Sequence, residues 1–197
     1  MDDQILLHLE ANREEDRLLF EHQINIAKKL FPTIENPNQA AEKLMHRYYR
    51  SSFTISEINS TVIQSFKEKN GLTKFTKKRR IDENFYSQNN LIHLFDLNGF
   101  KKDSSLLLEM FIKLSENSTL EGIGSATLRA LKRDRELIDT EFRSNKTNIN
   151  LFLKLLQSER LVVTQLENMK DLGILGRYLP EFGRVTGQMQ YDLFHIY

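Results

Sequence analysis

Acidic and imidazole side chains are the residues of this sequence that could carry out metal-assisted phosphoryl chemistry. Such chemistry needs closely placed carboxylates to hold Mg²⁺, or a His-Asp pair with further His and Asp ligands. No two of the aspartates are separated by a single residue: Asp2, Asp3, Asp16, Asp82, Asp96, Asp103, Asp134, Asp139, Asp171 and Asp192. No histidine is followed by an aspartate: His8, His22, His46, His93 and His195. We therefore predict no catalytic residues and no metal site in this chain.

Other motifs that position phosphates or nucleophiles are also missing from the sequence. It contains no Gly-x-x-x-x-Gly-Lys-Ser/Thr, His-Glu-x-x-His or Gly-x-Ser-x-Gly. The segment Gly122-Ile123-Gly124-Ser125 resembles half of a dinucleotide-binding loop, but we predict no strand before it. A turn followed by a helix that Ser125 caps is the favoured interpretation. Because the histidines are dispersed along the chain, we interpret them as packed or surface residues rather than ligands.

A single dense basic run, Lys74–Arg80, contains four consecutive cations at residues 77–80. Such a run could serve an independent helical module that binds a protein or RNA partner. The whole chain has 28 Lys and Arg against 27 Asp and Glu, a net charge of +1, which makes nucleic acid an unlikely partner. A solvated loop is the simpler interpretation of the run.

The composition of the chain limits which classes of protein it can belong to. With 40% apolar residues in 197, the chain can bury a core as one large domain or two small ones. The lack of cysteine excludes disulfides, thiolate metal sites and cysteine nucleophiles. No apolar run is long enough to span a membrane, and the acidic start MDDQILLHLE is unlike a targeting leader. We expect a cytoplasmic protein with no membrane partner.

Apolar residues at helical spacing predict an all-α fold, a helical bundle with one long helix and one small β-hairpin insertion. The long helix is expected at Pro37–Lys69, capped by Asn36 and ended near Gly71, and could form the spine of the domain. The hairpin should pair Ile81–Tyr86 with Leu91–Phe95 across a turn at Ser87–Asn90. Further helical segments are expected at Gln4–Phe31, with a polar middle (Asn12–Arg17) that must be solvated or bound to something missing, and at Leu106–Leu114, Ser125–Leu137, Asn148–Gln157 and Glu159–Lys170.

The last segment, Asp171–Tyr197, contains Gly173, Gly176, Gly183 and Pro180, so no long helix is expected there. Its final residues, Phe194–Tyr197, are mostly large and apolar. A frayed terminus is usually polar, so we expect a domain cut where its next element begins. We divide the chain into a helical domain, residues 1–170, and a junction, residues 171–197.

This last segment, with GILGRYLPEF and GQMQYDLFHIY, closely resembles the bifunctional uridylyltransferase/uridylyl-removing enzymes that modify the nitrogen-signalling protein PII. In that family it looks like the junction from the nucleotidyltransferase half into a His-Asp (HD) phosphohydrolase domain. Helices downstream of the nucleotidyltransferase core are matched by four further stretches, the last more loosely: LMHRYYRSSFTISEIN (44–59), LLLEMFIKLSEN (106–117), ATLRALKRDRELIDTEFRSN (126–145) and LLFEHQINIAKKLF (18–31). The related glutamine-synthetase adenylyltransferases lack this GQMQYDLFHIY junction.

The resemblance implies a non-catalytic helical domain that supports the nucleotide site and links it to the HD domain. The catalytic core, the HD domain and the terminal ACT domains would lie outside this chain. The parent enzyme would use UTP and magnesium to uridylylate PII when glutamine is low, and would hydrolyse the UMP off when glutamine is high. No cofactor is expected in the chain itself.

The same resemblance makes Arg47 and Arg50 candidate residues for nucleotide phosphate binding. They lie three positions apart, on neighbouring sites of one helical face. Tyr48 and Tyr49 should carry the apolar repeat while the arginines point more toward solvent. In nucleotidyltransferases generally, helices behind the core supply cations to the triphosphate, and arginine donates two parallel hydrogen bonds to phosphate. The competing interpretation pairs the arginines with Glu42, Glu57 or solvent.

Overall fold

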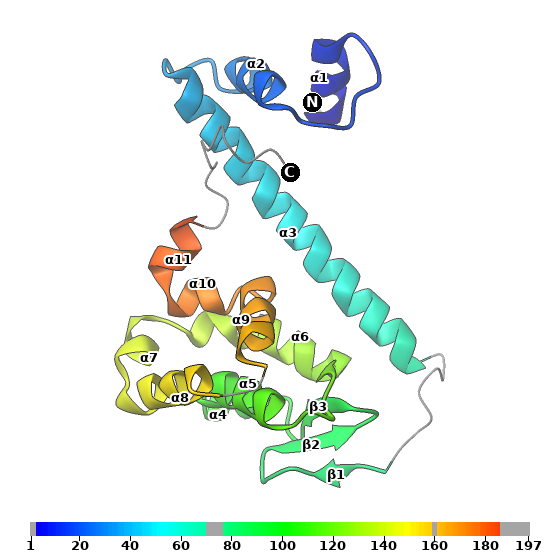
Figure 1. Ribbon diagram of the computed structural model, residues 1–197, viewed down its shortest axis with the longest axis vertical. Helices are drawn as coiled ribbons and strands as arrows, with labels where there is room; N and C mark the ends of the chain where they lie inside the picture. Colours follow the sequence, from blue (N-terminus) through cyan, green and yellow to red (C-terminus); the bar gives the residue numbers. More distant parts are fainter. Residues whose placement is uncertain (1–2, 70–76, 159–160, 186–197) are drawn as a thin grey trace. The chain divides into compact units, whose positions relative to one another are not determined.

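The computed structural model describes residues 3–69, 77–158 and 161–185, which form helices and one small sheet (Figure 1). The chain divides into two compact units, residues 1–54 with 184–197 and residues 55–183. Each unit is described by itself. The mostly helical prediction is confirmed, but the bundle is not, and the β structure is larger than a hairpin.

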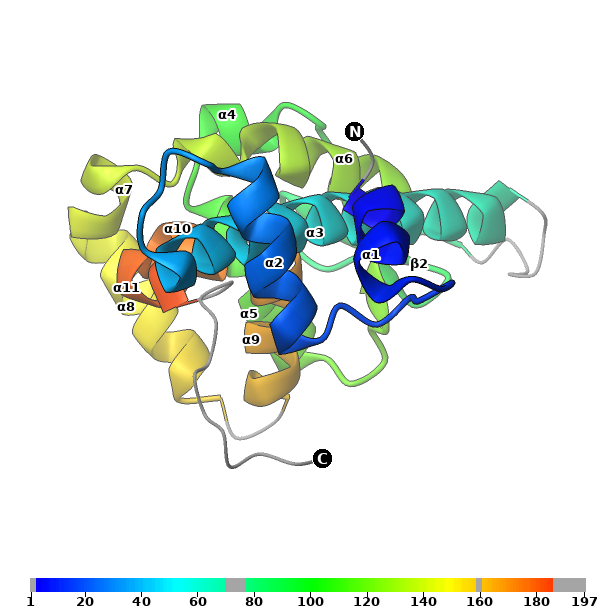
Figure 2. The same ribbon diagram turned by 90° about the horizontal axis from the view of Figure 1, so that it is seen from above.

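Two short helices of the first unit, α1 (Asp3–Ala11) and α2 (Phe20–Leu30), pack side by side (Figures 1 and 2). The helical periodicity predicted over Gln4–Phe31 breaks after Ala11, where Asn12 adopts a left-handed conformation (φ 53°). A small apolar core joins both helices to the start of the long helix: Leu6, Leu7, Ile26, Ala27, Ala40, Ala41 and Leu44.

Five of the six residues in the polar segment Asn12–Arg17 are exposed, as expected, and only Glu15 is buried. Glu15 is only 6% exposed. Its carboxylate accepts hydrogen bonds from the backbone N–H of Arg17 (3.1 Å) and from the Arg13 guanidinium (2.6 Å). These charge-assisted bonds hold the pKa of Glu15 at about 2.

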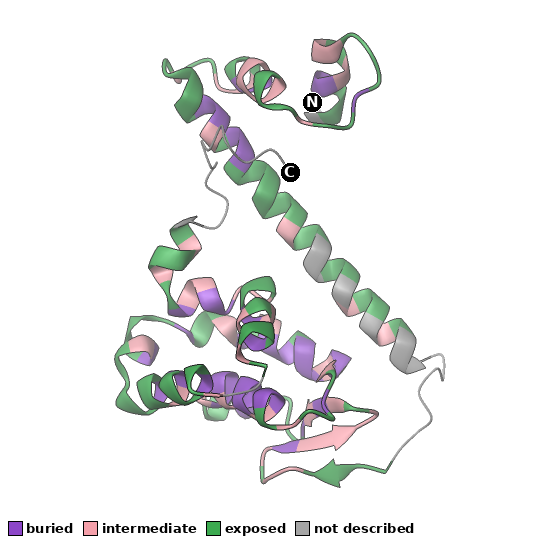
Figure 3. Ribbon diagram, viewed as in Figure 1, coloured by how far each residue is buried: buried purple, intermediate pink, exposed green. Residues whose placement is uncertain are grey.

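The long helix α3 extends from Pro37 to Lys69, as predicted. Asn36 caps it, because its side-chain oxygen accepts the backbone N–H of Asn38 (3.0 Å). Its first turns are buried against α1 and α2, whereas most of the described side chains after Met45 are exposed (Figure 3). The interpretation of this helix as the spine of the domain stays a prediction, and most of its described side chains after Met45 do not belong to a core. Gly71 lies outside the described residues.

The second unit contains a four-stranded sheet in the order β1-β2-β3-β4, where only a hairpin was predicted. Its strands are β1 (Arg79–Arg80), β2 (Phe85–Gln88), β3 (Leu91–Leu94) and β4 (Gly122–Ile123). The turn predicted at Ser87–Asn90 is shorter than expected, because Ser87 and Gln88 belong to β2. Asn89 and Asn90 have φ of 54° and 60°, as a two-residue hairpin turn requires. β4 pairs in parallel with β3, with Leu91 opposite Gly122.

The first hairpin strand begins at Phe85, not at Ile81 as predicted. The Asp82 carboxylate accepts the backbone N–H groups of Asn84 (2.9 Å) and Phe85 (2.8 Å). These bonds make a tight turn that interrupts the strand. β1 therefore precedes this turn and pairs antiparallel with β2, with Arg80 opposite Tyr86.

The core of the second unit is built around α5 (Leu106–Glu116), which is buried on nearly all sides (Figure 3). Such a helix belongs in the interior. The buried sheet residues Phe85, Ile92 and Leu94 belong to the same cluster as Phe111. The sheet is tied to α6 (Ser125–Asp134), because the backbone N–H of Leu94 donates to the Thr127 hydroxyl (2.9 Å).

The remaining helices are short: α4 (Gly99–Lys102), η1 (Arg135–Leu137), α7 (Thr140–Ser144), α8 (Lys146–Leu156), α9 (Val162–Asp171), α10 (Leu175–Tyr178) and α11 (Pro180–Val185). Between residues 171 and 185 the glycine-rich segment contains two short helices, α10 and α11, which agrees with the expectation that no long helix forms there. Gly173 follows α9 in the left-handed region (φ 69°), also as expected. Gly176 and Gly183 approach so closely that a Cβ on Gly183 would lie 2.7 Å from the Gly176 carbonyl oxygen.

Two other expected helix starts were displaced. Ser125 is the first residue of α6, and no side-chain hydrogen bond caps that helix at Gly124. α8 begins two residues before the predicted Asn148, because Asn145 caps it by accepting the backbone N–H of Thr147 (2.8 Å).

Candidate functional site

The two candidate phosphate-binding residues, Arg47 and Arg50, are both exposed on α3, as expected. The neighbouring tyrosines are not core residues, contrary to the prediction. Tyr48 and Tyr49 are each 47% exposed and pack edge to face, with ring centroids 5.8 Å apart. α3 therefore presents two arginines and two half-exposed aromatic rings within four residues. Cations and aromatic rings together suit an anionic ligand with a planar group.

The next turns of α3 expose large apolar side chains, which we call the α3 stripe. It consists of Ile55 (64% exposed), Ile58 (59%), Val62 (58%), Ile63 (49%) and Phe66 (63%). Four of these residues follow one another at spacings of three and four, so they lie on one helical face. Exposed apolar residues that are grouped in this way mark an interaction surface more often than scattered ones do.

The described part of the chain contains no set of side chains that could bind a catalytic metal ion. No group of three or more His, Asp or Glu side chains gathers there to hold a metal ion. These residues do not fit a magnesium site, and we derive no step through one. Among the histidines, His46 is exposed on α3, His93 packs in the sheet, and His195 lies outside the described residues. The ring nitrogens His8 Nε2 and His22 Nδ1 are buried without a hydrogen-bond partner.

Among the carboxylates of the second unit with shifted pKa values, Asp82 has a structural role. Burial opposes ionisation of Asp82, but hydrogen bonds from Lys113 and from the backbone N–H groups of Phe85 and Asn84 outweigh burial and lower its pKa. The Lys113–Asp82 ion pair (3.0 Å) links α5 to the turn before β2. Burial raises the pKa of Glu109 on α5, and the charge of Asp103 adds to this shift.

The glycine-rich candidate, residues 122–125, belongs to the sheet. No strand directly precedes this segment in the described part of the chain, as predicted, but Gly122 and Ile123 themselves form the short strand β4, which was not expected. The backbone N–H of Gly124 donates to the Ile92 carbonyl (2.9 Å), so it is not available to a phosphate. A Cβ on Gly124 would lie 2.1 Å from the His93 ring. This glycine therefore makes room for His93 rather than for a ligand.

Arginines of the segment after α5 hold backbone carbonyl groups. Arg133 donates to the Leu97 carbonyl (2.8 Å), Arg135 to that of Leu172 (2.9 Å) and Arg143 to that of Arg177 (3.2 Å). These bonds connect segments 34 to 37 residues apart in the chain. The three arginines therefore stabilise the fold of this unit.

An open depression of about 300 Å³ lies near the start of α8. Its polar lining includes charged residues of both signs and neutral ones: Lys101, Lys102, Ser104, Asp139, Glu141, Asn145 and Asn148. At least four of these side chains are already engaged. Lys102 pairs with Asp96 (2.8 Å), and Asp139 accepts the backbone N–H of Phe142 (2.9 Å). Asn145 accepts the backbone N–H of Thr147 (2.8 Å), and Asn148 donates to the Phe142 carbonyl (3.0 Å). The depression shows no concentration of one charge that would select a phosphate.

One cluster was missed by the sequence reasoning. On the outer face of the sheet the Tyr86 and His93 rings stack at 4.9 Å, Phe95 packs on Tyr86 at 4.8 Å, and Lys78 Nζ lies 4.7 Å from the centre of the Tyr86 ring. The signal was present in the alternation of FYSQ and LIHL, whose outward residues are opposite each other only in the observed register.

No helix in the described part of the chain is both long and apolar enough to cross a membrane.

Comparison with known proteins gives matches over nearly the whole chain. The family model described as "Uridylyltransferase GlnD third domain" matches residues 85–178, and "GlnD PII-uridylyltransferase" matches residues 4–63. The bifunctional uridylyltransferase/uridylyl-removing enzyme of Nitrosococcus oceani is 38% identical over 192 residues. Enzymes of the same name from Pseudomonas putida and Pseudomonas aeruginosa are 40% identical over 197 and 192 residues. No solved structure gives a significant match.

Each of these alignments covers 97% of this chain but only 21–22% of the relative. The chain therefore spans about a fifth of the length of the curated relatives it matches. Neither family model matches residues 64–84, which include the basic run.

Proposed function

Because this chain belongs, as a segment, to the family of bifunctional uridylyltransferase/uridylyl-removing enzymes, we propose that it is a non-catalytic helical domain of such an enzyme. In this proposal the whole enzyme uridylylates PII with UTP and removes the UMP by hydrolysis. The helical domain supports the nucleotide site and links it to the HD domain. Catalytic carboxylates and magnesium belong to other parts of the enzyme.

The observation that carries this proposal is the α3 stripe. Five large apolar side chains, each between 49% and 64% exposed, lie on one long helix. Full burial of such a side chain is worth about 1.5–3 kcal/mol, so leaving all five in water forgoes a large stabilisation. A neighbouring domain of the same enzyme would cover this face. With only about a fifth of the relatives' length present here, most of the enzyme is available to provide that cover.

The same helix places Arg47 and Arg50 near the nucleotide in our proposal. Both are exposed, and they are only eight and five residues before the start of the stripe. A domain that packs on the stripe would lie close to both arginines. One of them would then donate parallel hydrogen bonds to the UTP phosphates, or to the domain boundary beside them.

Single alanine variants of Arg47 and Arg50 in the full-length parent enzyme test this role. Each should raise the KM for UTP or lower kcat for PII uridylylation, while uridylyl removal stays intact. Loss of one bidentate phosphate contact corresponds to roughly 1.5–3 kcal/mol, or more than tenfold in kcat/KM. Lys28→Ala, which removes an exposed cation from α2 of the same unit, is the matched control. Wild-type transferase kinetics in both arginine variants would show that they are surface residues only.

The isolated chain should be folded and inactive. It should neither transfer UMP from UTP to PII with Mg²⁺ nor hydrolyse uridylylated PII with Mn²⁺. Turnover in proportion to the amount of this chain would contradict a non-catalytic role. Glutamine, the regulator expected for the parent enzyme, should not alter the stability of the isolated chain. We place the parent enzyme in the cytoplasm, with PII as its protein substrate.

A second candidate function, an independent protein- or RNA-interaction module, is favoured by one observation only. The cations Lys77–Arg80 lie on and just before β1, and one of them, Lys78, packs on the outer aromatic cluster. This surface is compatible with either role of the chain.

A further inference from the structure

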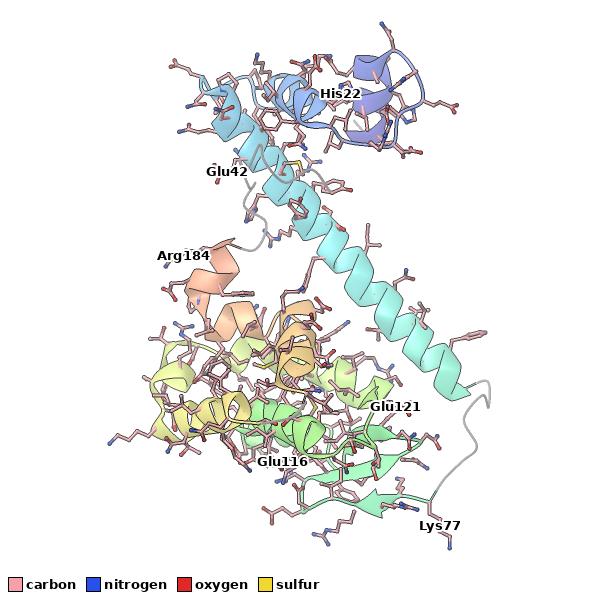
Figure 4. The ribbon with its side chains drawn as sticks, in the orientation of Figure 1. His22, Glu42, Lys77, Glu116, Glu121 and Arg184 are labelled. Atoms are coloured by element: carbon pink, nitrogen blue, oxygen red, sulfur yellow. The ribbon has the colours of Figure 1, made fainter. Side chains whose placement is uncertain are left out.

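The first strand of the sheet and its outer face form a basic surface to which the proposed function assigns no role. We call it the basic edge: Lys77, Lys78, Arg79 and Arg80, together with the Tyr86, His93 and Phe95 rings. All four cations are exposed. Figure 4 shows Lys77 just before β1, with its side chain extending away from the sheet.

The pairing of the strands explains how the cations and rings come together. Arg80 lies opposite Tyr86, which lies opposite His93, so these three side chains share one face of the sheet. Lys78 is two residues before Arg80 and projects to the same side, where its Nζ lies over the Tyr86 ring. Arg79 lies on the alternate side but beyond the core, and is exposed as well.

β1 is the outermost strand of the sheet among the described residues. In an antiparallel ladder every second residue of an edge strand turns its backbone N–H and C=O away from its neighbour. Such an edge can add another extended chain. Proteins commonly protect edges with short strands and positive charges, and β1 has both features. These charges repel a second copy of the same strand but attract an acidic one.

The charges around the edge favour an acidic partner. In the part of the chain that the structure describes, the side chains of Lys77 and Arg79 form no ion pair, while the Arg79 carbonyl accepts a hydrogen bond from the Ser87 hydroxyl (3.4 Å). The nearby carboxylates are largely committed elsewhere: Asp82 pairs with Lys113, Asp96 with Lys102, and Glu121 accepts a hydrogen bond from Asn90. Glu83 is the remaining acid of the β1–β2 connection and is exposed. Arg80 Nε donates to the Asp82 carbonyl (2.8 Å), so the other N–H groups of Arg80 and the side chains of Lys77, Lys78 and Arg79 give this edge an excess of positive charge.

The aromatic cluster argues against single-stranded nucleic acid. Binding of bases to a sheet requires free ring faces on which they can stack. Here the Tyr86 ring is stacked on the His93 ring with an interplanar angle of 14°. The Tyr86 ring also contacts Phe95 and the Lys78 ammonium group. The His93 ring packs directly on Gly124, where any Cβ would overlap the ring. The rings are thus mutually satisfied, and Phe95, 52% exposed, offers an apolar contact to a peptide side chain.

We propose that β1 binds an extended acidic peptide segment, which adds to the sheet as a further strand and pairs its carboxylates with Lys77, Lys78, Arg79 and Arg80. The backbone hydrogen bonds provide the orientation and the charges provide the selectivity. This proposal does not depend on the enzymatic role assigned to the chain.

The probe is a short fluorescein-labelled peptide of alternating Glu and Thr residues, and binding is followed by fluorescence polarisation. We expect binding that weakens steeply with salt, because the contacts are exposed ion pairs. Lys77→Glu combined with Arg79→Glu should weaken it by about tenfold or more. Lys28→Glu combined with Lys146→Glu makes the same change of net charge at exposed residues that do not belong to the sheet and should leave the affinity unchanged. The neutral pair Lys77→Gln and Arg79→Gln should give an intermediate loss.

Two further results distinguish strand addition from other modes of binding. Bound peptide should slow amide hydrogen exchange at residues 79–80, which it would not do if only side chains were involved. An alternating Lys-Thr peptide and an oligouridylate of similar length should bind more weakly than the acidic peptide. Tighter binding of the oligouridylate, unchanged affinity in the Lys77/Arg79 variants, or unaltered exchange at β1 would each overturn the proposal.

Discussion

Two apolar helices of this protein, α5 and α3, have similar side chains and opposite surroundings. On α5, Leu107 and Phe111 are 0% exposed, whereas on α3 Ile58 and Phe66 are 59% and 63% exposed. Both helices were expected from the same three- and four-residue spacing. The spacing of apolar residues thus specifies that a helix forms and which face is apolar. What covers that face depends on residues far away in the chain or outside it.

The largest expected difference in stability is between two Phe→Ala substitutions, one on α5 and one on α3. Phe111→Ala leaves a cavity in the middle of the core and should lower the free energy of unfolding by about 3–5 kcal/mol. Phe66→Ala removes a ring from water and should change it by less than about 0.5 kcal/mol. Urea unfolding of both variants, followed by circular dichroism, provides the measurement. Equal destabilisation by the two substitutions would mean that the α3 stripe is already buried in this chain.

Glycine substitutions sharpen the comparison between tight and open packing. A Cβ on Gly183 would lie 2.7 Å from a backbone oxygen, that of Gly176, which cannot move aside like a side chain. A Cβ on Gly122 would meet only the end of Leu91 at 3.6 Å, an ordinary contact. We expect Gly183→Ala to cost about 1–3 kcal/mol and Gly122→Ala less than about 1 kcal/mol. Thermal unfolding compares them, and a reversed order would contradict the close approach of α10 and α11.

Local signals in the sequence were sufficient for some elements. Asn36 and Pro37 gave the start of α3, and Asn89-Asn90 gave the turn between β2 and β3. The strand β4 was missed because two residues carry no periodicity and their partner, Leu91, is about thirty residues away. The displaced start of β2 has a different cause, namely the Asp82 side chain, which binds backbone groups that a longer strand would use.

The candidate site follows the same division. Exposure of Arg47 and Arg50 was predicted from helical geometry, while their role at a phosphate stays a prediction. The partial exposure of Tyr48 and Tyr49 was not foreseen, because the apolar repeat does not reveal that the packing ends near Met45. Nor does the sequence show that Gly124 makes room for His93, since this contact exists only in the folded sheet.

Acid pH should destabilise the polar segment of the first unit, with a smaller effect than the substitutions above. The pKa of Glu15 is lowered from 4.5 to about 2, so its contribution to stability is present above pH 4.5 and is lost as the pH falls toward 2. Glu15→Gln should remove this part of the pH dependence, while Glu14→Gln, an exposed neighbour, should keep it. Nuclear magnetic resonance of amides at residues 13–17 follows the transition. Identical acid titrations of the two variants would show that the Glu15 contacts do not form in solution.

Hydrogen exchange along α3 tests most directly whether its apolar stripe is a surface for another part of the enzyme. Backbone amides of residues 55–66 should exchange rapidly in the isolated chain, because few tertiary contacts stabilise these turns. In the full-length enzyme the same amides should exchange at least about 100-fold more slowly, while the exchange rates of the α5 amides should change little. Equal rates for residues 55–66 in the isolated chain and in the full-length enzyme would contradict the account.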